Sequence, residues 1–425
     1  MSQAPPQSKA YRIYAVTVLA LIYFFYMMDR SAMVVSQEMI KHEFGLSDST
    51  IGLLTGALYG VAYAIAGIPM GWAADRANRA KLMASVVAIW SGLTALSGLC
   101  TNVVQLAFTR VGVGAAESGG GPAAMSIVTD MFPPERRGTV ASFLYSGAKV
   151  GGIASFIVGG YVAHEYGWRA VFLSFGLPGL LLALLLLLTI KEPPRTGSAD
   201  GAGKPKASLR ETWQVLCTPG LGSIYIATGL TMMAVAGVGT WTLPFVTRAY
   251  GLNVKTAGLL LGMGPGVFGV IGGLVVGVLF DWARRFGPRG PLMVVALGCL
   301  VYIGGGVMVL LAPNVALAAV GLCVLGTAQA IYSAPTSAAI SELAPTAVRG
   351  TAFALYSIVA NVIGAGIGPI LVGALSDRFG GDAHALRMAM MVVLMILLLG
   401  AAAYVRASYV FAAETTRRRL ALSPA

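Results

Sequence analysis

Charged residues are scarce in this chain of 425 residues: only 11% are Asp, Glu, Lys or Arg, whereas 57% are apolar. A soluble protein of this length carries roughly a quarter charged residues. The polar side chains are therefore too few to cover a surface in contact with water. A mean hydropathy of +0.78 agrees that lipid is the expected solvent.

Cysteine and histidine are also rare, with 4 and 3 copies. No two cysteines form a Cys-x-x-Cys pair, so we expect no disulfide framework, no metal site and no cofactor. The sequence shows no HExxH, GxSxG or phosphate-loop motif, so we expect a protein that is not an enzyme.

Apolar stretches long enough to cross a bilayer recur along the chain. They predict an all-α membrane protein of twelve transmembrane helices, because the short alternating segments of a β-barrel are missing. We expect the spans at residues 12–40, 49–74, 80–100, 103–131, 134–164, 168–190, 221–250, 255–283, 291–312, 315–343, 346–379 and 385–411.

Basic residues are distributed unevenly between the two sides of these spans. With a cytoplasmic N-terminus, 20 of the 29 Lys and Arg residues lie on the inside and six on the outside. This positive-inside bias predicts that both termini are cytoplasmic. It also accounts for the net charge of +12 without any nucleic-acid partner.

A stretch rich in Pro, Gly and charge separates two groups of six spans. It predicts an N-terminal six-helix bundle (1–190), a cytoplasmic linker (191–220) and a C-terminal six-helix bundle (221–425). Residues 208–216 are expected to form a short surface helix. Residues 133–139 resemble residues 345–351 at an offset of 212, which indicates that the two halves are related.

The turn after the second span reads Gly71-Trp-Ala-Ala-Asp75-Arg76-Ala-Asn-Arg79-Ala-Lys81. It resembles the signature G-x-x-x-D-R-x-x-R-[RK] of the major facilitator superfamily. Partial copies follow spans eight and eleven, and ordinary basic charge in cytoplasmic loops is the alternative explanation. The resemblance implies the major facilitator fold, with an inner gate formed by Gly71, Asp75, Arg76, Arg79 and Asp130.

Spans one and four narrow the resemblance. Span four reads Arg110-Val-Gly-Val-Gly114-Ala-Ala-Glu117-Ser-Gly-Gly-Gly-Pro122, and span one carries Tyr26-Met-Met-Asp29-Arg30. They resemble the Spinster branch, whose members move lysolipids and sphingolipid-like amphiphiles. The Asp-Arg pair also occurs in organic anion:proton symporters of the superfamily. Span five lacks the Gly-Pro pair typical of drug antiporters, which disfavours that class.

Charges inside the spans are the main functional signal, since one at a helix centre costs about 2.5–3.5 kcal/mol. Spans one and four line the central cavity of major facilitator proteins, so the resemblance implies that Asp29, Arg30, Arg110 and Glu117 share one site. We expect Asp29 and Glu117 to couple transport to protons, and Arg30 and Arg110 to tune them or hold an anionic headgroup. A static ion-pair network that fixes helix packing is the structural alternative.

The C-terminal half carries few charges inside its spans, so its pocket is expected to be largely apolar. A charged half that faces an apolar half suits an amphiphile. The further candidates for the pocket are Lys149, Trp241, Gln329, Tyr332 and Asn361.

The sequence thus predicts a secondary active transporter, coupled to protons, that moves a lysophospholipid or sphingolipid derivative by alternating access. The alternative is a proton-coupled symporter of small organic anions. The expected partners are the amphiphilic substrate, protons and membrane lipids, around a monomer. We expect a multi-pass protein of a bacterial inner membrane.

Overall fold

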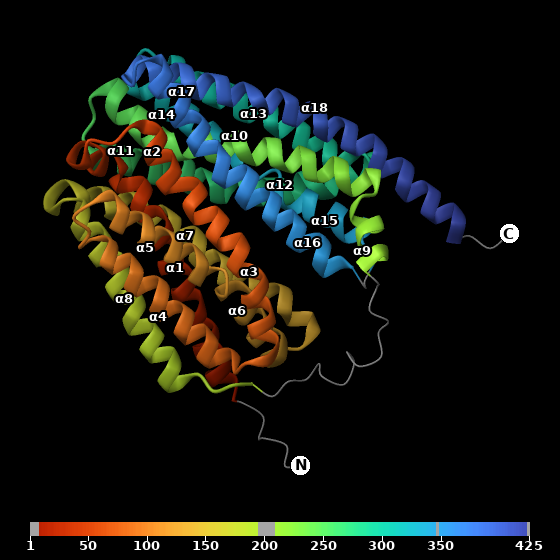
Figure 1. Ribbon diagram of the computed structural model, residues 1–425. Helices are drawn as coiled ribbons and strands as arrows, with labels where there is room; N and C mark the ends of the chain where they lie inside the picture. Colours follow the sequence, from red (N-terminus) through yellow and green to blue (C-terminus); the bar gives the residue numbers. More distant parts are fainter. Residues whose placement is uncertain (1–7, 194–208, 346–347, 423–425) are drawn as a thin grey trace. The chain divides into compact units, whose positions relative to one another are not determined.

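The computed structural model describes residues 8–193, 209–345 and 348–422, and helices dominate these residues (Figure 1). Most of the expected linker, residues 194–208, lies outside the described residues. The elements are α1 (Lys9–Phe44), α2 (Asp48–Gly52), η1 (Leu53–Ala57), α3 (Leu58–Arg76), α4 (Arg79–Ser97), α5 (Val103–Glu117), α6 (Gly120–Met131), α7 (Pro134–Tyr166), α8 (Trp168–Thr189), α9 (Leu209–Leu216), α10 (Pro219–Tyr250), α11 (Val254–Leu261), η2 (Gly262–Val267), α12 (Phe268–Ala283), η3 (Arg284–Phe286), α13 (Gly290–Leu311), α14 (Val315–Gln329), α15 (Ser333–Leu343), α16 (Arg349–Ile358), η4 (Val359–Ile367), α17 (Gly368–Phe379) and α18 (Ala383–Leu422).

Eleven helical stretches in the described part of the chain are long and apolar enough to cross a membrane. The remaining expected span, 103–131, is divided into α5 and α6 by a break at residues 118–119. Three glycines and Pro122 follow Ser118, and both residue types weaken a helix. The predicted all-α architecture of twelve spans is therefore confirmed, with span four built from two helices.

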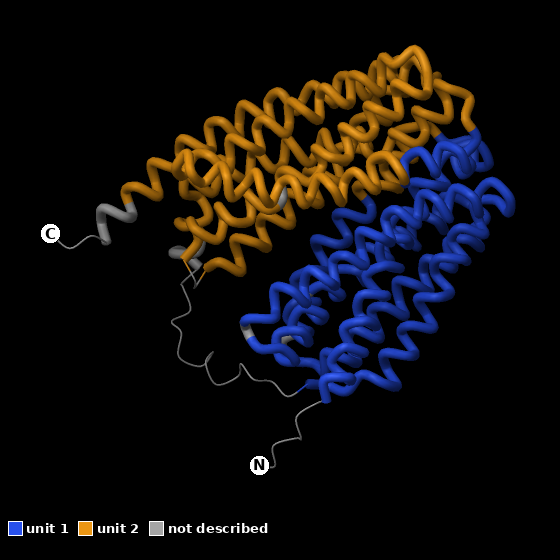
Figure 2. The backbone as a smooth tube through the Cα atoms, turned by 180° about the vertical axis from the view of Figure 1, so that it is seen from behind, with its two compact units in different colours: residues 1–46, 58–203, 253–262 blue, residues 47–57, 204–252, 263–425 orange. Residues whose placement is uncertain are grey.

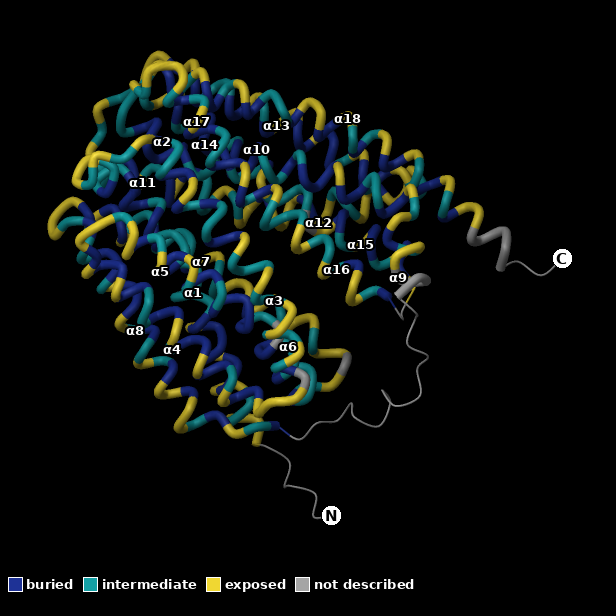
Figure 3. Tube along the Cα trace, viewed as in Figure 1, coloured by how far each residue is buried: buried dark blue, intermediate teal, exposed yellow. Residues whose placement is uncertain are grey.

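Large apolar side chains remain exposed along the helices, as the scarcity of polar residues predicted. Ile68 on α3 and Leu188 on α8 are 73% and 74% exposed. Figure 3 shows exposed residues recurring along α4 and α8. Such faces suit the hydrocarbon of a bilayer, so the chain is a multi-pass integral membrane protein.

The internal repeat extends from the sequence to the local structure. α5 and α14 begin 212 residues apart, after Asn102 and Asn314. Each asparagine caps its helix by accepting a hydrogen bond at 3.0 Å from the backbone N–H three residues later. The breaks that follow, at residues 118–119 and 330–332, lie at corresponding positions.

The chain forms two compact units, coloured in Figure 2. Unit 1 comprises residues 1–46, 58–203 and 253–262, and unit 2 comprises residues 47–57, 204–252 and 263–425. Each unit therefore contains one short segment from the opposite half of the sequence. In unit 1, α11 packs on α7, and in unit 2, α2 packs on α17.

Glycine allows two long helices of unit 1 to approach closely. A Cβ at Gly147 or Gly151 of α7 would overlap the carbonyl oxygen of Ala20 or Phe24 on α1. The neighbouring Gly152 faces open space, with nothing within 4 Å of a Cβ. The α1–α7 contact thus depends on small residues at particular positions of one helix face.

We expect Gly151→Ala to destabilise the protein by about 1–3 kcal/mol, because the added methyl group separates two packed backbones. Gly152→Ala is the matched control and should be neutral or slightly stabilising, because alanine favours a helix. The thermal unfolding midpoint in detergent measures both. Equal midpoints for the two variants would contradict this account of the contact.

Candidate functional site

Four charged side chains lie together inside unit 1. Asp29 and Arg30 are adjacent on α1, and Arg110 and Glu117 lie seven residues apart on α5. Seven residues make about two helical turns, so both point to the same side of α5. Asp29, Arg110 and Glu117 are 0%, 2% and 1% exposed, whereas Arg30 is half-buried.

The two carboxylates are held by hydroxyl groups. Ser91 on α4 donates a hydrogen bond to Oδ2 of Asp29 at 3.4 Å. Tyr59 on α3 donates to Oε2 of Glu117 at 2.5 Å. The second oxygens, Oδ1 of Asp29 and Oε1 of Glu117, are buried and have no hydrogen-bond partner among the described residues.

Hydroxyl groups also hold the two guanidinium groups. Arg30 donates from Nη1 to the hydroxyl of Tyr26 at 3.3 Å, and Arg110 donates from Nη2 to Oγ of Ser97 at 3.0 Å. The Arg110 guanidinium also lies 5.3 Å from the ring centre of Phe172. No ion pair within the described ranges joins either arginine to a carboxylate. Hydroxyl groups therefore contact these charges directly in the described residues.

A cavity of about 260 Å³ opens beside Glu117, and we call it the aromatic cavity. Glu117 is the one charged side chain among the described residues that line it. Most of its surface comes from rings and aliphatic groups, so it suits an apolar or amphiphilic ligand. The aromatic residues of its lining are Tyr23, Tyr26, Tyr63, Trp90 and Tyr145.

Lys149 and Trp241, two of the further pocket candidates, differ in exposure. Lys149 on α7 is exposed. Trp241 on α10 is fully buried in unit 2, and its indole N–H donates to the carbonyl oxygen of Pro369 at 2.9 Å. The contacts of Trp241 are those of a packing residue.

The other candidates belong to unit 2 as well. Tyr332 lines a small cavity of about 10 Å³, which is too small for a substrate. Gln329 is exposed, and Asn361 donates from Nδ2 to the carbonyl oxygen of Ser357 on its own helix at 2.9 Å. The structure thus gathers the predicted charges of unit 1 into one site but does not gather the pocket candidates of unit 2.

The expected gate residue Arg79 is 2% exposed at the start of α4. It forms an ion pair with Asp130 and donates to Oγ of Ser126 at 3.0 Å. It also donates to Glu192 at 2.7 Å and to the carbonyl oxygen of Pro193 at 2.8 Å. The sequence had not indicated Glu192, because that residue looked like ordinary linker charge.

Arg76 and Gly71, two of the remaining gate candidates, have fewer contacts. Arg76 is exposed and lies 4.3 Å over the ring of Trp72. Gly71 has open space beside it. The side chain of Asp75 lies outside the described residues.

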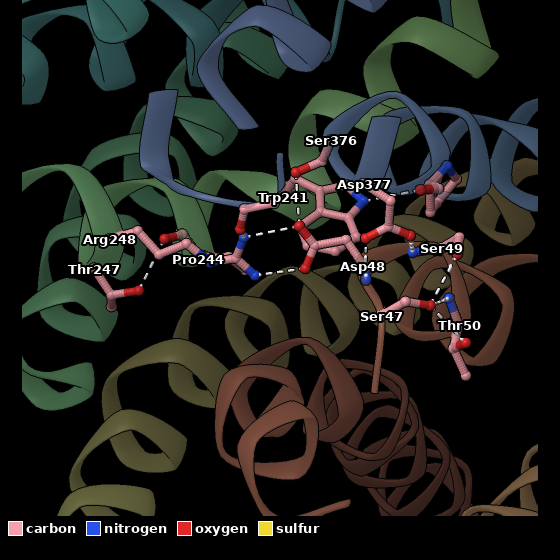
Figure 4. Close-up of polar contacts among 12 residues, drawn as sticks. Ser47, Asp48, Ser49, Thr50, Trp241, Pro244, Thr247, Arg248, Ser376 and Asp377 are labelled. Carbon is pink, nitrogen blue, oxygen red and sulfur yellow. Dashed lines mark hydrogen bonds and ion pairs between the residues drawn. The ribbon is translucent and has the colours of Figure 1, made fainter. Parts of the chain in front are cut away.

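A buried polar network in unit 2 was missed by the sequence reading (Figure 4). Asp48, at the start of α2, is 0% exposed and forms a two-bond ion pair with Arg248 of α10 at 2.8 and 2.9 Å. Ser376 of α17 donates to Asp48 at 2.6 Å. Asp377 accepts the backbone N–H groups of Asp48 and Ser49, both at 2.8 Å. The network joins α2, α10 and α17 within one unit.

Two signals in the sequence could have indicated this network. Ser47 precedes Asp48 as a helix cap and accepts from the backbone N–H of Thr50, which is a recognisable helix start. Ser376 and Asp377 belong to the second partial copy of the loop signature, the one that follows span eleven. Neither signal shows which helix meets which, since that depends on the packed structure.

Comparisons with known proteins agree with this architecture. The chain matches the family model described as Major Facilitator Superfamily over residues 19–369 and 282–422. It is 32% identical over 397 residues to an MFS-type efflux pump of Mycolicibacterium smegmatis, covering 93% of this chain and 92% of that protein. It is 25% identical over 393 residues to a protein named "Probable galactarate/D-glucarate transporter" of Bacillus subtilis, covering 83% of each.

A solved structure with a similar fold is that of a bacterial homolog to the human lysosomal transporter Spinster, in an inward-facing and unoccupied conformation. The TM-score is 0.84 at 27% sequence identity. The similarity covers 95% of this chain and 98% of that chain.

We expect Arg248→Met to lower the free energy of unfolding by about 3–5 kcal/mol, because it leaves the Asp48 carboxylate buried without its ion pair. Adding Asp48→Asn should recover part of the loss. Lys255→Met is the control, because its ion pair with Glu165 is largely exposed. That variant should lose about 0–1 kcal/mol. Thermal unfolding in detergent compares the three, and equal losses from the two single variants would contradict the role given to Asp48.

Proposed function

Because the chain belongs to the Major Facilitator Superfamily and is a membrane transporter, we propose that it moves an amphiphilic lipid and couples this movement to protons. The resemblance to the Spinster branch, drawn from spans one and four, is confirmed by the similar solved structure. A lysophospholipid or a sphingolipid derivative is the proposed substrate.

The aromatic cavity beside Glu117 is the observation that carries this proposal. The lining of this cavity is largely apolar, and its polar groups are the Glu117 carboxylate, the tyrosine hydroxyls and the Trp90 indole, which is the mixture that an amphiphile needs. An amphiphile can place its polar group near Glu117 and its chain against the rings. The family resemblance to lipid carriers points to the same class of substrate.

Proton coupling is supported by the state of the two carboxylates. Asp29 and Glu117 are buried in a bundle that lies in the membrane, and neither is neutralised by a direct ion pair in the described residues. A carboxylate held in this way gains or loses a proton readily when its surroundings change. Glu117 lines the cavity, so substrate binding changes its surroundings directly.

We further propose alternating access in which the Arg79–Asp130 cluster belongs to an inner gate. The gate candidates are Gly71, Asp75, Arg76, Arg79 and Asp130. In this proposal both termini are cytoplasmic, the protein works as a monomer, and the membrane is a bacterial inner membrane. The excess of basic residues on the side of the termini supports the orientation.

A proton-coupled symporter of small organic anions is the second candidate. Arg30 is half-buried beside the aromatic cavity, and its guanidinium lies 4.8 Å from the ring centre of Tyr59. A similar protein is named for galactarate and D-glucarate, which are dicarboxylates. In this alternative Arg30 binds a carboxylate of the substrate.

Reconstituted liposomes with an imposed pH gradient distinguish the two candidates. Uptake of a lysophospholipid, of sphingosine and of glucarate is measured under the same gradient. Lipid uptake that collapses with the gradient supports the first candidate, and glucarate uptake supports the second. Lipid uptake that ignores the gradient would leave a lipid transporter without proton coupling.

We expect Glu117→Gln and Asp29→Asn to fold and to lose pH-driven uptake by about tenfold or more, because an amide cannot take up the proton. Tyr59→Phe should have a smaller effect, since it removes only the hydrogen bond to Glu117. Thermal unfolding of each variant in detergent checks the fold. Normal pH-driven uptake by both amide variants would show that Asp29 and Glu117 do not couple transport to protons.

A further inference from the structure

Three hydroxyl side chains occupy one face of α4 inside unit 1. Ser91, Thr94 and Ser97 follow one another at intervals of three residues, and all three are fully buried. Three residues advance about 4.5 Å along a helix, so the row extends over about 9 Å. We call this row the hydroxyl ladder.

The ladder begins at a carboxylate and ends near the surface of the bundle. Ser91 donates to Asp29 at 3.4 Å, and Ser97 donates to Thr109 at 2.8 Å while accepting from Arg110 at 3.0 Å. Ser97 is the last residue of α4, at the end of the helix opposite Arg79. The exposed loop begins within two residues, since Leu99 is 61% exposed.

Several atoms along the ladder are buried without a protein partner. Three buried polar atoms have no hydrogen-bond partner among the described residues: Oγ1 of Thr94, Oδ1 of Asp29 and Nε of Arg110. A buried polar group left in this way costs about 1–3 kcal/mol, so such groups persist where water bonds to them. A water between neighbouring hydroxyls of the ladder would supply these missing hydrogen bonds.

The repeat provides an internal comparison. At the offset of 212 residues, Ser91, Thr94 and Ser97 correspond to Ile303, Gly306 and Val309 of α13. Arg110 corresponds to Leu322. The same helix packing therefore forms in unit 2 without any of these hydroxyls. The hydroxyls of the ladder thus occur in the half that has the buried charges, and the helix arrangement does not require them.

We propose that the hydroxyl ladder carries protons between Asp29 and the end of unit 1 opposite Arg79, along a path separate from the aromatic cavity. This inference rests on the proton coupling proposed above. Each hydroxyl oxygen accepts a proton from one bridging water and releases its own proton to the next, so its composition is unchanged. None of the ladder residues lines the cavity.

Charge along the ladder gives the path a direction. Arg110 lies at one end and Asp29 at the other, so the field between them favours a proton at Asp29. The same positive charge raises the barrier to every cation at that end of the ladder, protons included. Glu117 faces the cavity instead, so the substrate meets Glu117 whereas the ladder delivers protons first to Asp29. A proton can therefore reach Asp29 without passing the substrate. The charge of Asp29 then acts on Glu117, which lines the cavity.

Thr94→Val tests the path, because valine keeps the shape of threonine and removes only the hydroxyl. In liposomes, we expect lysophospholipid uptake driven by a pH gradient to fall by about tenfold. Exchange of lysophospholipid at equal pH on both sides requires no net proton movement and should stay within about twofold of the wild type. The thermal unfolding midpoint should be unchanged or higher, since no protein partner is lost.

Thr94→Ser retains the hydroxyl and should restore pH-driven uptake. Thr17→Val is the matched control, because the one hydrogen bond of the Thr17 hydroxyl within the described part of the chain goes to the carbonyl oxygen of Ile13 on its own helix, and Thr17 is exposed. Full pH-driven uptake by Thr94→Val would overturn the proposed path. A Thr94→Val protein with a lower unfolding midpoint that loses uptake and exchange equally would also overturn it. A wild-type protein whose uptake ignores the gradient would instead overturn the proton coupling, and the path with it.

Discussion

The hydrocarbon core of a bilayer offers no hydrogen-bond partner, so every polar group placed there has to find one inside the protein. Helices meet this requirement for the backbone, and the long helices of both units follow from it. Side chains meet it less easily. The four charges of unit 1 do so through Ser91, Tyr59, Ser97 and Tyr26 rather than through one another. A hydroxyl both donates and accepts, so it suits either sign of charge and either protonation state.

The two halves of the repeat use the same helix plan for different chemistry. α5 and α14 share their cap, their length and the break that follows. Yet Glu117 corresponds to Gln329, and the buried Arg110 corresponds to Leu322. The buried charges Arg110 and Glu117 are therefore a feature of unit 1, whereas unit 2 carries its own buried polar network around Asp48. The two halves share one helix arrangement, and substitutions at a few buried positions give them different chemistry.

Much of the fold follows from the sequence, because apolar length and the positions of loops are visible along a single chain. The site of four charges can also be predicted from the sequence, because a carboxylate such as Asp29 or Glu117 within an apolar run is costly and seldom serves packing alone. The hydroxyl partners are not visible, because a serine in a membrane helix resembles any other small residue until the rotation of the helix is known. Asp48 was assigned to a loop, although packing buries it completely.

The exchange of short segments between the two units has a consequence for synthesis. A chain emerges from the ribosome from its N-terminus, so the first six spans enter the membrane before residues 253–262 exist. Unit 1 lacks one of its own segments during that interval, and the face of α7 that receives α11 has only lipid beside it. Residues 47–57 wait even longer for α17, on which α2 packs. Assembly of the two halves is therefore interdependent, and a chain divided at residues 194–208 would yield two fragments, neither of which contains a whole unit.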